Sequence, residues 1–299
     1  MKTQAKKLRE LIARPGPIVS MGVWDPFSAI VAEQEGFEVL TVFGSITSWA
    51  MIGKSDTGYI TQTEMVDTAR RVVQSVSTPV IVDCDDGFGD PINVIRTVKL
   101  VEQIGAAGLY IEDLSRPLRC SALGEGGMIP SDVMVQKIRA AVDARTDPDF
   151  VIIARTDAYE GADEMIVRAR KYVEAGADMV LIIGLLTVED MKKVATEAGV
   201  PLATLQAART KMPFGPPNEV ADMGYKIIFH VQTLFMAAAH SMRQAAHELM
   251  EDLQKGDETP RLLPGQSPVE IEKSIGLDKD DAIINGYFGV NCPLPDQAK

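Results

Sequence analysis

Eight short apolar segments, rich in β-branched residues, recur along most of the chain and limit the folds open to it. Each is nearly continuous in hydrophobicity, which is typical of a parallel strand buried on both faces. Helical patterns separate the segments, and several of these end in glycine. Eight strands that alternate with helices predict an α/β fold, a (β/α)8 TIM barrel, with a doubly wound sheet as the alternative. The segments are PIVSMGV (17–23), VLTVFG (39–44), PVIVDCD (79–85), GLYIED (108–113), FVIIART (150–156), MVLIIG (179–184), PLATLQ (201–206) and KIIFHV (226–231).

The length of 299 residues suits one barrel of roughly 250 residues with an extension. We predict a barrel with an N-terminal helix over residues 1–254, and a linker, C-terminal helix and tail over 255–299. The stretch KGDETPRLLPGQSP (255–268) is polar and rich in proline and glycine, as expected of an exposed connection. The sequence leaves open whether the following helix packs on its own barrel or on a neighbour's.

Charge and cysteine content exclude several kinds of partner. The formal net charge of −12 argues against binding to nucleic acid or anionic membranes, because phosphate contacts need clustered lysine and arginine. The N-terminal sequence lacks the apolar stretch of a signal peptide, so we expect a cytoplasmic protein. Cys84, Cys120 and Cys292 are the only cysteines and show no CxxC spacing. A disulfide framework or zinc cluster is therefore not indicated, and a bound metal should take oxygen ligands.

The segment VDCDDGFGD (82–90) carries the strongest chemical signal. Period-two alternation sends Asp83 and Asp85 to the same side of the third strand, so that two carboxylates face one cation. Such a pair favours Mg²⁺ or Mn²⁺. For Asp86 and Asp90 we favour a different role, capping of the helix that begins next.

Other polar groups follow neighbouring strands. Glu112 closes the fourth strand and Arg155 the fifth, and the carboxyl ends of barrel strands converge on one mouth. A cation and an arginine there suit a small anionic substrate, because arginine can bind a carboxylate bidentately. Gly44 and Ser45 follow strand two, where their N–H groups form either a carboxylate cradle or an ordinary turn.

Two further residues are candidates for proton transfer. Cys120 lies in a glycine-rich stretch that is long for a βα loop, where it either exchanges a proton with the substrate or packs as a small side chain. His230 ends strand eight, at the predicted mouth. His240 and His247 are seven residues apart on the final barrel helix, where packing or solvated roles are favoured.

Taken in order, these segments resemble the isocitrate lyase and phosphoenolpyruvate mutase superfamily over roughly residues 5 to 250. The resemblance implies a (β/α)8 barrel, dependence on Mg²⁺, and a 2-oxo or 2-hydroxy carboxylate substrate. It also implies that a C–C or P–C bond is made or broken through an enolate-like species. The matching segments are GFEVLTVFGS, GKSDTGYIT, TPVIVDCDDGFGD, GAAGLYIEDLSRPLRC, KIRAAVDAR, DFVIIARTDA and YVEAGAD.

The resemblance also implies roles for individual residues. Asp83 and Asp85 match the metal-binding carboxylates, Asp56 and Glu112 match the acids that complete the metal shell through water, and Arg155 matches the substrate arginine. The backbone that grips a carboxylate in the family corresponds here to Phe43, Gly44 and Ser45. Family members commonly form homotetramers that exchange the C-terminal helix, which implies that role for the tail from residue 268.

The chain departs from the family pattern at the lid and after strands six and seven. The lid motif KRCGH of methylisocitrate and dimethylmalate lyases reads LRCSA at 118–122, which retains Cys120 but loses the lysine and histidine. The usual glutamate after strand six is replaced within 181–184, and the usual asparagine after strand seven falls near Leu205. An ordinary isocitrate or methylisocitrate lyase is therefore not predicted.

The predicted function is a Mg²⁺-dependent lyase that cleaves a C–C bond of a small 2-hydroxy or 2-oxo carboxylic acid. Cys120 or His230 would manage the proton, and Arg209, Lys211 and His230 offer other ways to bind an anion. One alternative is an oxaloacetate-type decarboxylase, a phosphonopyruvate hydrolase or a phosphonomutase on the same scaffold. A second alternative, of another class, is a non-catalytic metabolite-binding barrel.

Overall fold

The computed structural model describes residues 2–119, 126–157, 159–207, 213, 215–255 and 267–288. The chain forms two compact units, residues 1–238 and 239–299, and helix α10 (Thr233–Lys255) contributes to both. None of the described helices is both long enough and apolar enough to span a membrane. The division at residue 254 stays a prediction.

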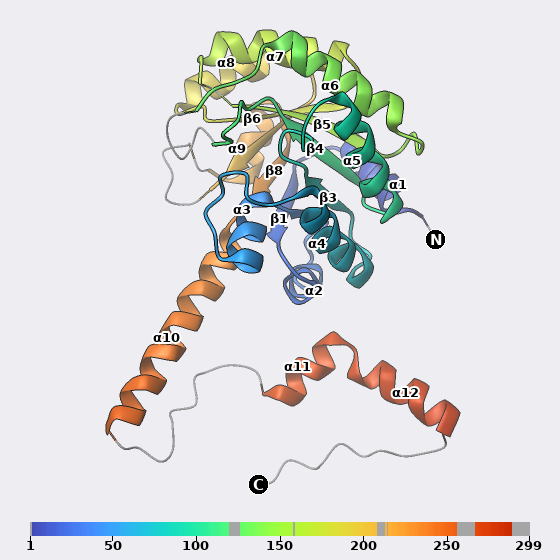
Figure 1. The fold of residues 1–299 in the computed structure, drawn as a ribbon, viewed down its shortest axis with the longest axis vertical. Coiled ribbons are helices and arrows are strands. Elements are labelled where there is room, and N and C mark those ends of the chain that lie inside the picture. Colours follow the sequence, from blue (N-terminus) through green and yellow to red (C-terminus); the bar gives the residue numbers. More distant parts are fainter. Residues whose placement is uncertain are drawn as a thin grey trace. The chain divides into compact units, whose positions relative to one another are not determined.

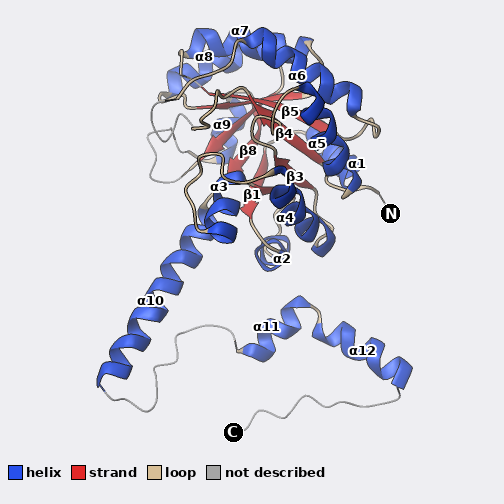
Figure 2. Ribbon diagram, viewed as in Figure 1, coloured by secondary structure: helices blue, strands red, loops and turns tan. Residues whose placement is uncertain are grey.

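In the first unit, the described residues form eight parallel strands that close into a barrel in sequence order, with β1 pairing β8. The predicted (β/α)8 barrel is confirmed, and Figures 1 and 2 show its helices outside the ring of strands. The strands are β1 (Ile18–Val23), β2 (Val39–Val42), β3 (Val80–Asp83), β4 (Gly108–Glu112), β5 (Val151–Asp157), β6 (Met179–Ile183), β7 (Leu202–Gln206) and β8 (Tyr225–His230).

Helices follow the strands because the connecting residues supply helix starts. Asp25 and Thr61 each form a reciprocal capping box with the residue three positions later, which satisfies two otherwise unpaired backbone N–H groups. The helices of this unit are α1 (Gln4–Ala13), α2 (Pro26–Gln34), α3 (Gly44–Thr47), the π-helix η1 (Ser48–Ile52), α4 (Gln62–Ser75), α5 (Pro91–Gln103), α6 (Ser131–Ala144), α7 (Ala162–Glu174), α8 (Val188–Ala198) and α9 (Pro217–Asp222).

Strand alternation divides the core into two clusters. The interior cluster fills the barrel and includes Ile81, Ile153 and Phe229, whereas the outer cluster lies between strands and helices and includes Val82 and Ile152. Successive strand residues point to opposite sides, so membership of a cluster shows which way a side chain faces.

One end of the barrel is closed and the other carries polar residues. Leu8 of α1 is fully buried in the interior cluster at the amino end of the strands. Near the carboxyl end, Phe43, Tyr110 and Phe229 form an aromatic layer with ring centroids 5.9–6.2 Å apart. This layer is the floor of the barrel mouth, defined here as the space at the carboxyl ends of the strands.

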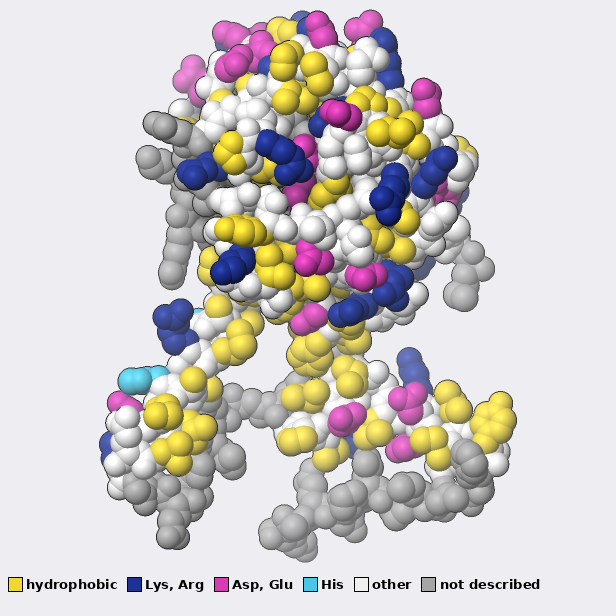
Figure 3. Space-filling model, viewed as in Figure 1, with side chains coloured by type: hydrophobic (Ala, Val, Ile, Leu, Met, Phe, Trp, Pro, Cys, Tyr) yellow, Lys and Arg dark blue, Asp and Glu magenta, His cyan; other side chains and the backbone are white. Residues whose placement is uncertain are grey.

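The second unit contains the end of α10, α11 (Pro268–Ile275) and α12 (Leu277–Phe288). Among its described residues no apolar side chain is buried. Ile271, Ile275, Ile283 and Tyr287 are exposed, and Figure 3 shows hydrophobic side chains over both short helices. Helices this short depend on burial of an apolar face for their stability.

The close approach of β1 to the backbone that follows β8 can be tested at Gly22. A Cβ atom there would lie 1.9 Å from the carbonyl oxygen of Val231, which is backbone and cannot move aside cheaply. We expect Gly22→Ala to lower the free energy of unfolding by at least about 3 kcal/mol, measured from the thermal unfolding midpoint. Gly286→Ala is the control, because nothing lies within 4 Å of its Cβ position. Equal midpoints for the two variants would contradict the close approach.

Candidate active site

Three strands bring charged side chains to the barrel mouth. Asp83, Glu112 and Arg155 alternate with residues of the outer cluster, so their side chains face the interior. Strand register places Glu112 opposite Arg155. All three side chains are at least nine-tenths buried, which makes this a strongly desolvated group of charges.

Asp83 is held by two backbone N–H groups. Its Oδ1 accepts from the N–H of Asp85 at 3.1 Å and its Oδ2 from the N–H of Gly44 at 2.8 Å. A Cβ on Gly44 would lie 3.1 Å from Asp85 Oδ1 and 3.2 Å from Asp83 Oδ2. Glycine is therefore what lets the start of α3 approach both carboxylates. The role of Phe43, Gly44 and Ser45 in gripping a substrate stays a prediction.

The backbone turns sharply at Asp85. Its φ of 44° lies in the left-handed region, which costs a residue with a side chain roughly 1–2 kcal/mol, although aspartate tolerates it better than most. The carbonyl of Asp85 accepts from the N–H of Glu112 at 2.8 Å. The turn is thus tied to β4, and Asp85 stays beside the other acids.

Arg155 lies between two carboxylates. Its Nη1 is 2.7 Å from Glu112 Oε2 and its Nε is 3.0 Å from Asp157 Oδ1. Two partners on different strand positions fix the plane of the guanidinium. The arginine therefore presents a fixed positive charge at the mouth.

The acids at the mouth repel one another. Burial raises the pKa of Asp85 well above its usual range, and Asp83 and Asp56 raise it further. Burial also raises the pKa of Glu112, against the opposing effect of Arg155. Burial and the charge of Asp83 raise the pKa of the half-buried Asp56 to about 6. The four carboxylates thus affect one another electrostatically, and a cation among them would favour their charged forms.

The donor set fits a hard divalent cation. No three His, Cys, Asp or Glu side chains in the described residues are arranged to ligate one ion together. Mg²⁺ usually keeps several waters and binds proteins through only one or two carboxylates. Asp83 and Asp85 would bind it directly, with Asp56 and Glu112 acting through water. These metal roles stay a prediction.

A second cluster supports the site from the outer face of the barrel. The buried Asp113 accepts through Oδ2 from Thr156 Oγ1 at 2.8 Å, Arg168 Nη1 at 2.9 Å and Tyr172 OH at 2.5 Å. Asp113 and Thr156 directly follow Glu112 and Arg155, so this network fixes the strand ends that carry them. Sequence reasoning missed the cluster, although an acid beside Glu112 on a buried strand needs a cationic partner.

The two acids predicted to cap the next helix differ in their contacts. Asp90 occupies the N-cap position of α5 but its side chain makes no capping hydrogen bond. Asp86 instead accepts from Arg116 Nε at 2.9 Å and Nη2 at 2.8 Å. Asp90 is therefore the N-cap residue as predicted, without a side-chain capping bond. Capping by Asp86 was wrong, because a bidentate ion pair takes up its carboxylate.

The remaining predicted site residues are either directed away from the mouth or lie outside the described residues. His230 is the last residue of β8 and alternates with the inward-facing Phe229, so the strand pattern directs its half-buried side chain outward. Burial lowers its pKa. Cys120, Arg209 and Lys211 lie outside the described residues, and their roles stay predictions, as does that of His230.

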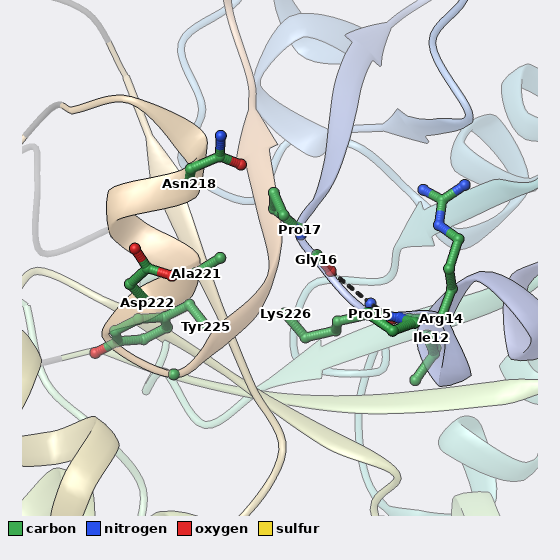
Figure 4. Close-up of a pocket in the computed structure, with 11 residues that line it drawn as sticks. Ile12, Arg14, Pro15, Gly16, Pro17, Asn218, Ala221, Asp222, Tyr225 and Lys226 are labelled. Atoms are coloured by element: carbon green, nitrogen blue, oxygen red, sulfur yellow. Dashed lines mark hydrogen bonds between the residues drawn. The ribbon is translucent and has the colours of Figure 1, made fainter.

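A surface cavity of about 420 Å³ lies at the amino end of the strands, away from these acids (Figure 4). Its two cationic side chains already have partners. Lys226 Nζ donates to the carbonyl of Gly16 at 2.6 Å, and Arg14 pairs with Glu38 at 2.6 Å. The cavity lacks the converging acids of the mouth, so the mouth is the stronger candidate site.

Comparisons with known proteins show the family of the chain. The family model described as phosphoenolpyruvate phosphomutase matches residues 8–250. A 2-methylisocitrate lyase of Aeropyrum pernix is 38% identical over 246 residues, which are 82% of this chain and 79% of the relative. A 2,3-dimethylmalate lyase of Eubacterium barkeri is 34% identical, with coverage of 95% of this chain and 98% of the relative.

Solved structures agree with the sequence relatives. Oxaloacetate acetylhydrolase in complex with 3,3-difluorooxalacetate has a TM-score of 0.88 at 30% identity, covering 95% of this chain and 97% of the other. Phosphonopyruvate hydrolase in complex with oxalate and Mg²⁺ has a TM-score of 0.84 at 25% identity, covering 97% and 100%. The predicted family is confirmed, and the chain belongs to the phosphoenolpyruvate phosphomutase family of the phosphoenolpyruvate mutase and isocitrate lyase superfamily.

Proposed function

We propose that the protein is a Mg²⁺-dependent lyase that cleaves a C–C bond of a small 2-hydroxy or 2-oxo carboxylic acid. The observation that carries the proposal is the convergence of Asp83, Asp85 and Glu112 with Arg155 at one buried mouth. The relatives named as lyases support the reaction class. The phosphonopyruvate hydrolase complex with Mg²⁺ supports the metal. A cytoplasmic location remains part of the proposal.

The chain's own residues account for substrate orientation. Arg155, fixed between Glu112 and Asp157, would bind the substrate carboxylate and hold the bond to be broken in one orientation. A Mg²⁺ held by Asp83 and Asp85 would supply a Lewis acid for charge that develops on the substrate oxygen. Burial of these groups excludes water, which strengthens each electrostatic contact.

Proton transfer is assigned to Cys120, with His230 as the second candidate. When the C–C bond of a 2-hydroxy acid breaks, its hydroxyl gives up a proton and becomes the carbonyl of the released 2-oxo acid. The bonding electrons stay on the departing fragment as a carbanion, which must gain a proton. Cys120 would donate that proton from the segment after β4. His230 stays the second candidate, although the pattern of β8 directs its side chain away from the mouth.

A second candidate function keeps the same site but changes the bond that breaks. Oxaloacetate acetylhydrolase is similar over 95% of this chain, which favours hydrolysis or decarboxylation of a 2-oxo diacid as the alternative; P–C chemistry on phosphonopyruvate is a related one. A non-catalytic barrel is disfavoured, because burying several like charges is costly without a role for them.

The function is tested by a substrate panel with Mg²⁺. We expect release of pyruvate or glyoxylate from one or more 2-hydroxy diacids, with oxaloacetate and phosphonopyruvate as comparison substrates. Asp85→Ala should abolish this turnover and leave the thermal midpoint close to that of the wild type, because it removes a metal-binding charge at the mouth without opening the core.

Asp90→Ala is the matched control, since Asp90 is exposed and lies five residues further along the same loop. It should retain the wild-type rate. Turnover that is indifferent to a chelator, or that survives in Asp85→Ala, would show that the metal assignment is wrong. Turnover of oxaloacetate or phosphonopyruvate alone would favour the second candidate function.

The role of Cys120 is tested by Cys120→Ser. We expect kcat to fall by roughly 10²-fold or more with little change in KM, as for a lost general acid. Cys292→Ser controls for loss of a thiol elsewhere in the chain. A rate close to that of the wild type would give Cys120 a packing role and show that another group donates the proton.

We also propose a homotetramer that exchanges its C-terminal helices. The exposed Ile271, Ile275, Ile283 and Ile284 on α11 and α12 support it, because they need a surface to cover them. A second copy of this chain would provide that surface, and the polar linker before α11 would act as a hinge.

Truncation of the chain at residue 262 tests this assembly. The intact protein should have the mass of four chains by light scattering, and the truncated protein should form smaller and less stable particles. An intact protein that is monomeric at micromolar concentration would rule out helix exchange. An unchanged number of chains per particle after truncation would do the same.

A further inference from the structure

The barrel mouth is charged on one side and apolar on the other. Strands β3 to β5 carry the acids and Arg155. Among the described residues, the inward positions of β6 to β8 carry Leu181, Ile183, Leu205 and Phe229, and these belong to or pack on the interior cluster. Strand register places Leu181 opposite Arg155, and Ile183 opposite Asp157. The apolar side therefore begins directly beside the arginine.

Aromatic side chains extend the apolar side above the barrel. Trp24, Trp49 and Phe235 are half-buried and pack on the interior cluster. The ring centroids of Trp24 and Phe235 are 5.2 Å apart, and those of Trp49 and Phe235 are 5.5 Å apart. Leu205, also half-buried, packs on the same cluster. These partly exposed apolar surfaces give a ligand at the mouth something to contact.

We infer that the substrate carries an uncharged alkyl group on the side away from its metal-binding carboxylate, and that Ile183 and Leu205 select for it. The inference rests on the proposed function, which places a carboxylate beside Arg155. A second carboxylate directed toward β6 and β7 would lose its water, and the inward side chains described there offer no hydrogen-bond donor. An alkyl group would instead bury apolar area and displace water.

Leu205 is the more accessible of the two selecting residues. Ile183 is almost completely buried and shapes the floor of the apolar side, whereas the half-buried Leu205 has surface left to contact a ligand. Thr204 and Gln206, its neighbours on β7, point to the outer face by strand alternation and do not supply donors to the mouth.

The test is the binding of three 2-oxo acids to the Mg²⁺-loaded protein by calorimetry, with no turnover needed. Pyruvate reports the shared head group. 2-Oxopentanoate and 2-oxoglutarate have the same chain length and differ only in a terminal methyl or carboxylate. We expect 2-oxopentanoate to bind at least ~10-fold more tightly than 2-oxoglutarate. Leu205→Asn should reduce this ratio several-fold, because its amide can donate to a carboxylate.

Leu205→Met is the conservative control and should keep the ratio, as should Ile92→Asn, which changes an exposed isoleucine on α5. If pyruvate binds, and 2-oxoglutarate binds at least as tightly as 2-oxopentanoate, the selection for an alkyl group is ruled out. The proposed site for the carboxylate is retained in that case. An unchanged ratio in a folded Leu205→Asn would remove Leu205 as a selecting residue. If none of the three acids binds, the proposed function is wrong and the inference fails with it.

Discussion

Strand alternation in a closed parallel barrel determines where the strand-borne functional groups lie. In such a barrel one residue of each strand faces the packed interior and the next faces the helices. This constraint puts Asp83, Glu112 and Arg155 in one small space, although long stretches of chain separate them. It also puts Asp113 and Thr156 just outside that space, where they can hydrogen-bond to each other. The charges at the mouth and the network behind them arise from adjacent residues of the same strands.

The two groups of charges have different electrostatic roles. Outside the barrel, burial raises the pKa of Asp113, but a hydrogen-bonded arginine, Arg168, and two hydroxyl donors oppose that rise. At the mouth, Arg155 is surrounded by more acids than it can neutralise, and burial raises the pKa of Glu112 and Asp85. The outer network therefore pairs its acid with a cation of the chain itself, although Asp113 Oδ1 is buried without a hydrogen-bond partner, whereas the mouth would gain stability from an added cation.

The sequence was sufficient for the barrel and for the strand-borne charges, because the apolar runs of β3 to β5 ended in charged residues whose side followed from the period of two. It was not sufficient for the network of Arg168 and Tyr172, which depends on the face that α7 turns toward β4 and β5. The sequence also did not show which side of β8 carries the His230 side chain, because a change of one residue in register reverses a side chain's direction. Contacts set by helix packing or by a single residue of register cannot be derived from local sequence patterns.

The apolar side of the mouth affects the acids as well as the ligand. Leu181 lies in register with Arg155, and Ile183 lies in register with Asp157. These two apolar side chains therefore exclude water from the charged side of the mouth, and the same surface would contact an alkyl group of the ligand. Loss of water is the largest contribution to the raised pKa of Glu112 and of Asp85. A polar group at Ile183 or Leu205 would let water approach these carboxylates and weaken their need for a cation. The proposed selection for an apolar substrate and the proposed binding of a metal would thus share one physical origin, the exclusion of water at the mouth.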